Sequence, residues 1–135
     1  AHQVTEATAI IRAIQEVDES IYLMGLAGSP IQRMAEKKQI LFVAEAFADR
    51  KYMEDGRLRS RSEIGAVIDS PEEAAQQVVD IVLKKRVKTY EGEHWPLEAQ
   101  SICIHGDNPA AVDVLQAIDQ RLQHENITKA AFSHA

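Results

Sequence analysis

The feature that most constrains the fold of this chain is a regular alternation of amphipathic helices with short apolar strands. Apolar side chains recur every three or four positions over residues 4–18, which predicts a helix, and a short apolar segment follows at 20–26. The alternation continues with a helix over 30–39 and a second apolar segment at 40–47. This order predicts an α/β fold in which parallel strands are joined by right-handed crossover helices.

Two of the expected helices begin with explicit capping signals. Ser29 stands before Pro30, and Ser70 stands before Pro71 with Glu73 at the third helical position. Serine is a preferred N-cap residue, proline suits the first helical position, and glutamate at the third position completes a capping box. We therefore expect helices to start at these two prolines.

The second half of the chain contains two long polar connections and one more strand. We expect loops at 48–70 and 86–100, a strand at 101–105, and a last helix that Asn108-Pro109 opens. The first loop contains the tight-turn signal Asp55-Gly56. Connections of this length are uncommon in compact domains and are often functional.

Three strands are too few for a closed barrel. A chain of 135 residues supports one domain, whereas a closed (β/α) barrel usually takes about 250 residues. We therefore interpret residues 1–135 as a single α/β unit that is part of a larger barrel domain, with a loosely ordered tail at 127–135. A small open α/β domain is the alternative.

Charge and cysteine content narrow the class of protein. Fifteen basic and 21 acidic side chains give a formal net charge of −6. This balance argues against nucleic acid as the main partner and against a polybasic membrane contact. No apolar run reaches the roughly 20 residues of a membrane span. Because Cys103 is the one cysteine, no internal disulfide can form, and a cytoplasmic location fits best.

Polar side chains follow two of the expected strands, at the strand ends where barrels and open α/β sheets carry their chemistry. Asp49 and Arg50 come after the second strand. His105 and Asp107 stand at the end of the last strand. Histidine can act as an acid or base near neutral pH, and arginine is a natural fork for a carboxylate. We predict a functional site at this edge of the sheet.

Each of these residues also has a purely structural interpretation. Glu45 lies within an apolar strand, so it is either functional or paired with Arg50 or Arg61, because an unpaired buried charge is costly. Asp49 and Arg50 can form a cap and a surface ion pair. Asp107 can cap the last helix.

Other conspicuous residues favour structural roles. The cluster Arg57, Arg59 and Arg61 suggests phosphate binding, but in an acidic chain a solvated loop face is the better interpretation. Cys103 stands between two isoleucines and is expected to pack in the interior, and Trp95-Pro96 is expected to anchor a loop. No phosphate-loop, dinucleotide-binding or zinc-protease motif occurs in the sequence.

Three segments of the chain resemble the LamB/YcsF family. They are LMGLAGS at 23–29, EAFADRKYMEDGRLRSRSEIGAVI at 45–68 and ICIHGDNPAAV at 102–112. The similarity extends over residues 4–127, and the second segment is long and specific. The family is that of the A subunit of the bacterial ATP-dependent 5-oxoprolinase, a lactam utilisation protein.

The resemblance implies a fold, a reaction and partners. The fold would be the C-terminal half of a seven-stranded (β/α) barrel-like domain of the polysaccharide-deacetylase type. The reaction would open the lactam of 5-oxo-L-proline to L-glutamate with hydrolysis of ATP, used with Mg²⁺ at the level of the complex. The partners would be 5-oxoprolinase subunits B and C and the missing N-terminal half of the same barrel.

Matched motifs also imply the site residues. The catalytic candidates are Glu45, Asp49, His105 and Asp107, and the substrate-binding candidates are Arg50, Arg61 and Tyr52. We expect Arg50 or Arg61 to bind the substrate carboxylate. We expect Asp49 or Asp107 to act with His105 in proton transfer.

The chain departs from the family in one respect. The motifs of the family's N-terminal half, of the form DxNxDxGE, GFHAGD, GAHP and KPHGALYN, are absent from these 135 residues. A metal ion would draw mainly on those motifs, so whether this chain binds a metal stays open. Two alternatives also stay open: a metal-dependent deacetylase-like hydrolase of the same barrel class, and a non-catalytic substrate-binding or scaffold subunit.

Overall fold

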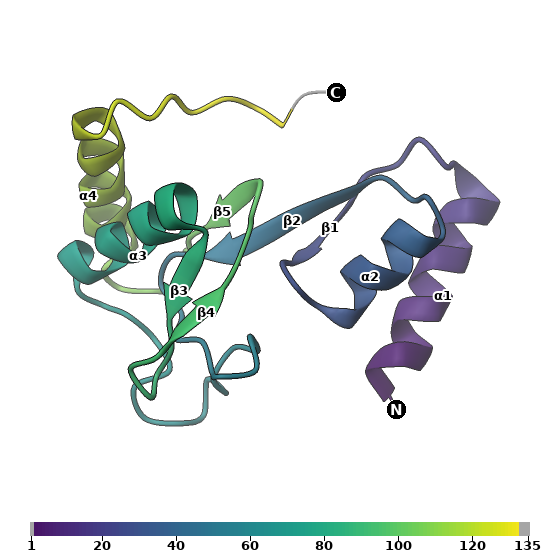
Figure 1. Cartoon of the computed structure of the whole chain (residues 1–135), viewed down its shortest axis with the longest axis horizontal. Coiled ribbons are helices and arrows are strands. Elements are labelled where there is room, and N and C mark those ends of the chain that lie inside the picture. Colours follow the sequence, from purple (N-terminus) through teal and green to yellow (C-terminus); the bar gives the residue numbers. More distant parts are fainter. Residues whose placement is uncertain (1, 133–135) are drawn as a thin grey trace.

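The computed structural model describes residues 2–132 and shows an alternating α/β chain (Figure 1). In chain order the elements are α1 (His2–Val17), β1 (Leu23–Leu26), α2 (Pro30–Lys37), β2 (Phe42–Phe47), α3 (Pro71–Lys84), β3 (Arg86–Lys88), β4 (His94–Pro96), β5 (Ser101–Cys103) and α4 (Ala111–His124).

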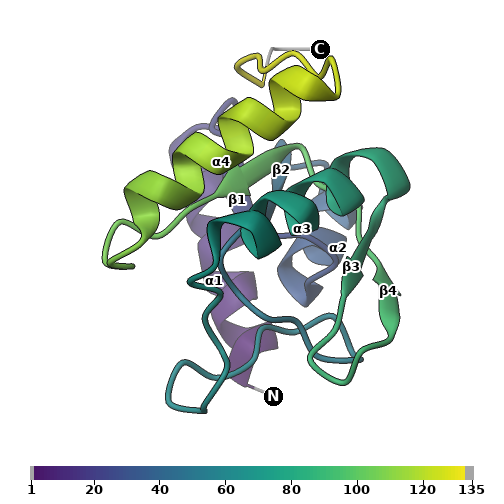
Figure 2. The ribbon, with the colours of Figure 1, turned by 90° about the vertical axis from the view of Figure 1, so that its left-hand side faces the viewer.

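The central sheet has three parallel strands in the order β1-β2-β5. β2 lies in the middle, pairs with β1 and β5, and has three buried residues. α1 and α2 lie beside its β1 neighbour, whereas α3 and α4 pack side by side near β5 (Figures 1 and 2). The predicted α/β fold with parallel strands and crossover helices is therefore confirmed.

Three clusters of buried apolar residues hold these layers together. One lies between α3 and α4 and includes Val78 and Val114. The second lies under β2 and the segment that leads into β5, around Tyr52 and Val87. The third joins α1 to α2 through Ile11. The inner parts of the apolar stripes thus face one another, as amphipathic helices require. Val17, Val112 and Leu115, which belong to the same stripes in the sequence, are exposed in the described structure.

Both predicted helix starts are confirmed. The hydroxyl of Ser29 accepts a hydrogen bond from the backbone N–H of Gln32, and that of Ser70 accepts one from the backbone N–H of Glu73. Each helix has proline in its first turn. Local sequence chemistry therefore determines where α2 and α3 begin, without help from the rest of the fold.

The prediction that residues 86–100 form only a loop was wrong. This segment contains the antiparallel hairpin formed by β3 and β4, in which Val87 lies opposite Trp95. The hairpin packs against the first long loop, where the backbone N–H of Tyr90 donates to the carbonyl of Tyr52 at 2.7 Å. Strands of three residues are too short to show an alternating apolar pattern, so the sequence does not reveal the hairpin. Its pairing depends on the contact with the first long loop.

The start of the last helix was also placed too early. α4 begins at Ala111, because the side chain of Asn108 is used elsewhere: its amide donates to the carbonyl of Ile68 at 3.2 Å and its oxygen accepts from the backbone N–H of Ala110 at 3.0 Å. Beyond α4, Ile127 packs on the α3–α4 cluster and the ring of Phe132 contacts that of Tyr22. Residues 133–135 of the predicted tail lie outside the described residues.

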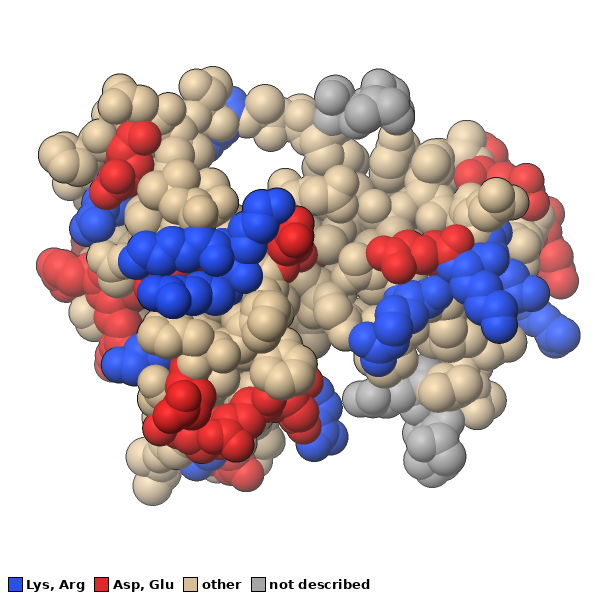
Figure 3. All heavy atoms as spheres, viewed as in Figure 1, with Lys and Arg blue, Asp and Glu red and all other residues tan. Residues whose placement is uncertain are grey.

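Figure 3 shows that acidic and basic side chains are mixed on the face presented there. Within residues 2–132, no helix is long and apolar enough to cross a membrane.

Candidate functional site

The parallel register of β2 and β5 brings two predicted site residues together. Phe47 lies opposite Cys103, and the N–H of Ala48 donates to the carbonyl of Cys103 at 2.9 Å. Asp49 and His105 each follow these paired positions by two residues. The adjacency expected from neighbouring strand ends is therefore present in the structure.

Asp49 and His105 form a direct pair. Oδ1 of Asp49 lies 2.8 Å from Nδ1 of His105, and Oδ2 accepts the backbone N–H of His105 at 3.1 Å. Asp49 is fully buried, whereas the side chain of His105 is about one-fifth exposed. A buried carboxylate needs hydrogen-bond donors, and one residue of the neighbouring strand end supplies two of them.

This pairing defines the histidine tautomer. An ionised carboxylate can only accept, so Nδ1 carries the hydrogen and Nε2 of the neutral ring has a free lone pair. The ring also stacks on Phe47, with centroids 5.1 Å apart and planes 13° from parallel. His105 is thereby held by three contacts, and Nε2 is the nitrogen left to meet a ligand.

Two buried amide side chains hold the backbone around Asp49. Nε2 of Gln77, on α3, lies within hydrogen-bond distance of the carbonyls of Phe47, Ala48 and Arg50, at 2.8, 3.2 and 2.9 Å. Asn108 reaches Oδ2 of Asp49 at 3.5 Å from the other side. The turn after β2 is therefore positioned by tertiary contacts.

A cavity of about 140 Å³ opens beside this pair. It brings five of the seven predicted site residues together, with walls completed by a valine, an asparagine and a proline. The lining residues are Asp49, Arg50, Arg61, Val67, His105, Asp107, Asn108 and Pro109.

The two arginines of the cavity differ in environment. Arg61 is about half exposed and its Nη1 pairs with Oδ2 of Asp107 at 2.9 Å, so this ion pair joins the long loop to the loop before α4. Arg50 is buried, and its Nη2 donates to the carbonyl of Arg59 at 2.6 Å. Burial, followed by the neighbouring charge of Arg61, lowers the pKa of Arg50. The predicted helix cap by Asp107 does not form, because α4 has no side-chain cap.

The other two predicted site residues do not line this cavity. Tyr52 is fully buried in the core, and its hydroxyl accepts the backbone N–H of Phe47 at 2.9 Å. Burial raises the pKa of Tyr52 far above its ordinary range. Glu45 lies on β2, half-buried, and pairs with neither Arg50 nor Arg61 in the described structure, so the alternative interpretation as a buried ion pair is not supported.

The rest of the basic cluster has partners in the protein. Arg57 pairs with Asp55 at the loop tip, and the guanidinium of Arg59 lies 3.7 Å above the centre of the Tyr90 ring. These contacts support the structural interpretation of the cluster. Cys103 is half-buried, less than expected, because β5 is an edge strand of the described sheet.

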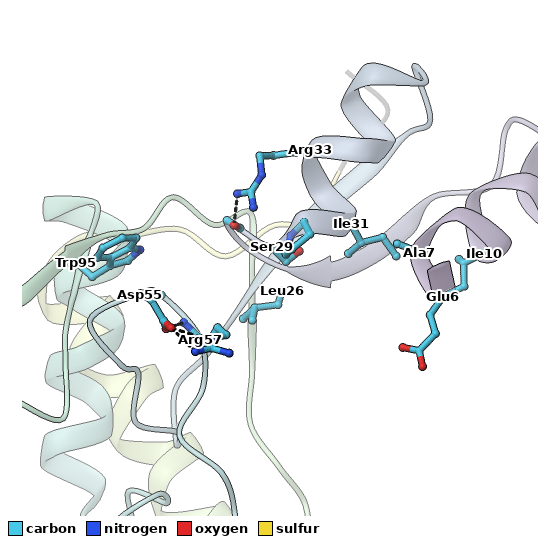
Figure 4. Close-up of a pocket in the computed structure, with 13 residues that line it drawn as sticks. Glu6, Ala7, Ile10, Leu26, Ser29, Ile31, Arg33, Asp55, Arg57 and Trp95 are labelled. Atoms are coloured by element: carbon cyan, nitrogen blue, oxygen red, sulfur yellow. Dashed lines mark hydrogen bonds and ion pairs between the residues drawn. The ribbon is translucent and has the colours of Figure 1, made fainter. Parts of the chain in front are cut away.

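A second, larger pocket of about 600 Å³ lies between α1 and the loop tip (Figure 4). Trp95, Asp55 and Arg57 form one wall, and Ile10 and Glu6 lie across the gap. It borders β1, an edge strand that pairs only with β2 in the described sheet.

The residues described here contain no group of three or more histidine, cysteine, aspartate or glutamate side chains that could hold a metal ion.

Sequence reasoning missed three residues that shape the site, namely Phe47, Gln77 and Asn108. Gln77 had a signal, because it stands three residues after Ala74 and four before Ile81, on the apolar face of its helix, where a polar side chain needs a buried partner. Phe47 had none, since any apolar residue satisfies the strand pattern.

Comparison with known proteins decides the family. The model of the LamB/YcsF family matches residues 1–135. The chain belongs to the LamB/YcsF family. Family membership was the expectation from the three quoted segments, and it is confirmed.

The chain spans about half the length of the similar proteins from this family. An A subunit of 5-oxoprolinase from Agrobacterium fabrum is 39% identical over 133 residues, which is 98% of this chain and 52% of that protein. The 5-oxoprolinase A subunit of Halalkalibacterium halodurans is 40% identical over 122 residues, 90% of this chain and 48% of that protein. The crystal structure of a lactam utilization protein from Thermus thermophilus superimposes with a TM-score of 0.83 at 33% identity, covering 93% of this chain and 50% of that one.

Proposed function

We propose that this chain is the C-terminal half of the A subunit of an ATP-dependent 5-oxoprolinase. In this proposal the assembled enzyme opens the lactam of 5-oxo-L-proline to L-glutamate with hydrolysis of ATP. The observation that carries the proposal is the buried Asp49–His105 pair beside a small cavity that two arginines also line. The names of the similar proteins support the choice of substrate.

The cavity suits a small lactam. Its volume is about 140 Å³, and a cavity of about 150 Å³ holds a benzene molecule, so a five-membered ring is of the right size. A nucleoside triphosphate does not fit, because pockets for larger ligands usually measure about 300–1,000 Å³. ATP, with Mg²⁺, is therefore bound elsewhere in the assembled complex in this proposal.

His105 is the acid–base group of the proposed reaction. In the assembled complex, ATP would supply a phosphoryl group to the lactam oxygen, which makes the carbonyl carbon more electrophilic. Nε2 of His105 takes a proton of a water molecule as the water oxygen adds to this carbon. The same proton then passes to the ring nitrogen as the carbon–nitrogen bond breaks, which forms the amine and leaves a γ-glutamyl phosphate. A second water hydrolyses this acyl phosphate to glutamate and phosphate. Asp49 holds Nδ1 and stabilises the positive charge that the ring carries between these two transfers.

The remaining half of the barrel has a natural place in this proposal. The relatives are about twice as long as this chain, and the outer edge of β1 has no strand partner within residues 2–132. Unpaired strand edges favour further pairing. We place the N-terminal half of a seven-stranded (β/α) barrel-like domain of the polysaccharide-deacetylase type along this edge and over the larger pocket.

The test is 5-oxoproline turnover by the complete A subunit reconstituted with the B and C subunits. We expect Asp49→Ala and Asp107→Ala to lower glutamate formation strongly when combined. Near-normal rates for the double variant would contradict the proposal and favour a non-catalytic scaffold. Activity without ATP that is lost on chelation would instead favour a metal-dependent hydrolase.

A further inference from the structure

Arg50 is a buried cation without a counter-ion. It is only 7% exposed, and no carboxylate lies within ion-pair distance of it in the described structure. Its guanidinium makes one hydrogen bond, from Nη2 to the carbonyl of Arg59, and Nε is buried with no partner. Buried polar groups are normally satisfied, so an orphaned donor beside a cavity indicates that something else accepts from this side chain.

The anion that would satisfy Arg50 is not supplied by the nearby acidic residues. Asp49 is occupied by His105 and Asn108, and Asp107 is paired with Arg61. The charges of Asp49 and Asp107 act on Arg50 only from beyond ion-pair distance, and the charge of Arg61 opposes them. A small anion that enters the cavity therefore meets a cation prepared for it.

Arg61 is the weaker candidate for the same task. Its side chain is 47% exposed, and its charge is already balanced by Asp107 at the rim. Solvent-exposed, paired guanidinium groups gain little from a further partner. Arg50 is desolvated, and its backbone is held across the loop by a bridge to Val67.

We propose that Arg50, and not Arg61, is the residue that recognises the carboxylate of the ligand in the small cavity. Arg61 and Asp107 then form the rim of the cavity. The ligand class is a small cyclic carboxylate, because Val67 and Pro109 provide apolar walls and the volume admits one ring. That this carboxylate belongs to 5-oxoproline rests on the proposed function.

Three probes separate the two parts of such a ligand. 5-Oxoproline has both the lactam and the carboxylate, 2-pyrrolidinone has the lactam alone, and cyclopentanecarboxylate has the charge and a ring without the lactam. Binding of each probe is measured by calorimetry on the complete A subunit. Turnover of 5-oxoproline is measured separately on the three-subunit complex.

We expect Arg50→Gln to weaken binding of both carboxylates about 10- to 100-fold, as loss of a charged hydrogen bond does, and to change 2-pyrrolidinone binding less than about threefold. Arg50→Lys keeps the charge but loses the paired donors of the guanidinium. Its affinity for both carboxylates should lie between that of the wild type and that of Arg50→Gln. Arg121→Gln is the matched control, since this arginine is half exposed on α4, is paired with Glu125 and lines neither cavity. It should change none of the three affinities.

The inference is overturned if Arg50→Gln weakens all three probes equally or weakens none, or if Arg61→Gln produces the selective loss. Charge-dependent binding at Arg50 without turnover of 5-oxoproline would uphold the inference and refute the proposed function. Turnover of 5-oxoproline without a selective effect of Arg50→Gln would refute the inference and uphold the proposed function. If Arg50→Gln does not fold, Arg50→Lys decides through the same comparison.

Discussion

Replacement of Asp49 by asparagine tests the proposed role of the buried pair most directly. The substitution keeps the size of the side chain but removes the charge that faces Nδ1 of His105 at 2.8 Å. Two opposite charges about 4 Å apart interact by about 4 kcal/mol at an effective dielectric constant of about 20. Since about 1.36 kcal/mol corresponds to a tenfold change in rate, we expect glutamate formation to fall about 10³-fold.

The assay is ATP-dependent glutamate formation by the reconstituted complex, with the unfolding temperature of each variant measured alongside. Asp80→Asn is the matched control, because it removes a carboxylate from the α3 surface, outside both cavities. Residues that act as a unit are strongly non-additive, so Asp49→Asn combined with His105→Gln should be no slower than His105→Gln alone. A tenfold or smaller loss for Asp49→Asn, or an equal loss for the control, would refute the reasoning.

Three further predictions concern stability and reactivity. Gln77→Met removes the donor to three backbone carbonyls and should lower the free energy of unfolding by about 1–3 kcal/mol, whereas the same change at exposed Gln76 should cost less than half of that in urea unfolding. Gly56→Ala should destabilise the protein by about 1–3 kcal/mol more than Gly92→Ala. Both glycines have positive φ, but only at Gly56 would a Cβ lie 2.5 Å from an indole nitrogen. Equal shifts of the unfolding temperature for the two variants would contradict this prediction. Burial, followed by the charges of two nearby acidic residues, raises the pKa of Cys103. Alkylation of this thiol by iodoacetamide at about pH 8 should therefore be slower in the native than in the unfolded protein, and it should accelerate as the pH rises above about 9. Equal alkylation rates in the native and unfolded protein would exclude the raised pKa.

Features with a local chemical signal were predictable from the sequence. The serine–proline starts of α2 and α3 are one example, because the cap and the first helical residue stand next to each other in the chain. The turn at Asp55-Gly56 is another: Gly56 has φ +78°, which glycine adopts without strain. The meeting of Asp49 with His105 followed from the rule that parallel strands end at one edge.

Features that depend on distant partners were not predictable. The β3–β4 hairpin is stabilised by contact with the long loop, and α4 starts late because Asn108 bonds to Ile68. Tyr52 stands within a polar loop segment, yet it fills the core. Nothing in the local pattern shows where such a side chain finds its partner.

The sequence by itself determined the α/β class, the starts of two helices, the family and the residues that stand at the strand ends, since periodicity, capping and motifs are properties of neighbouring residues. Only the tertiary structure decided which of these residues act together. It buried Asp49 against His105, paired Arg61 with Asp107, and left Arg50 without a counter-ion. Burial and charge pairing are decided between segments some 50 residues apart, so they appear only once the chain has folded.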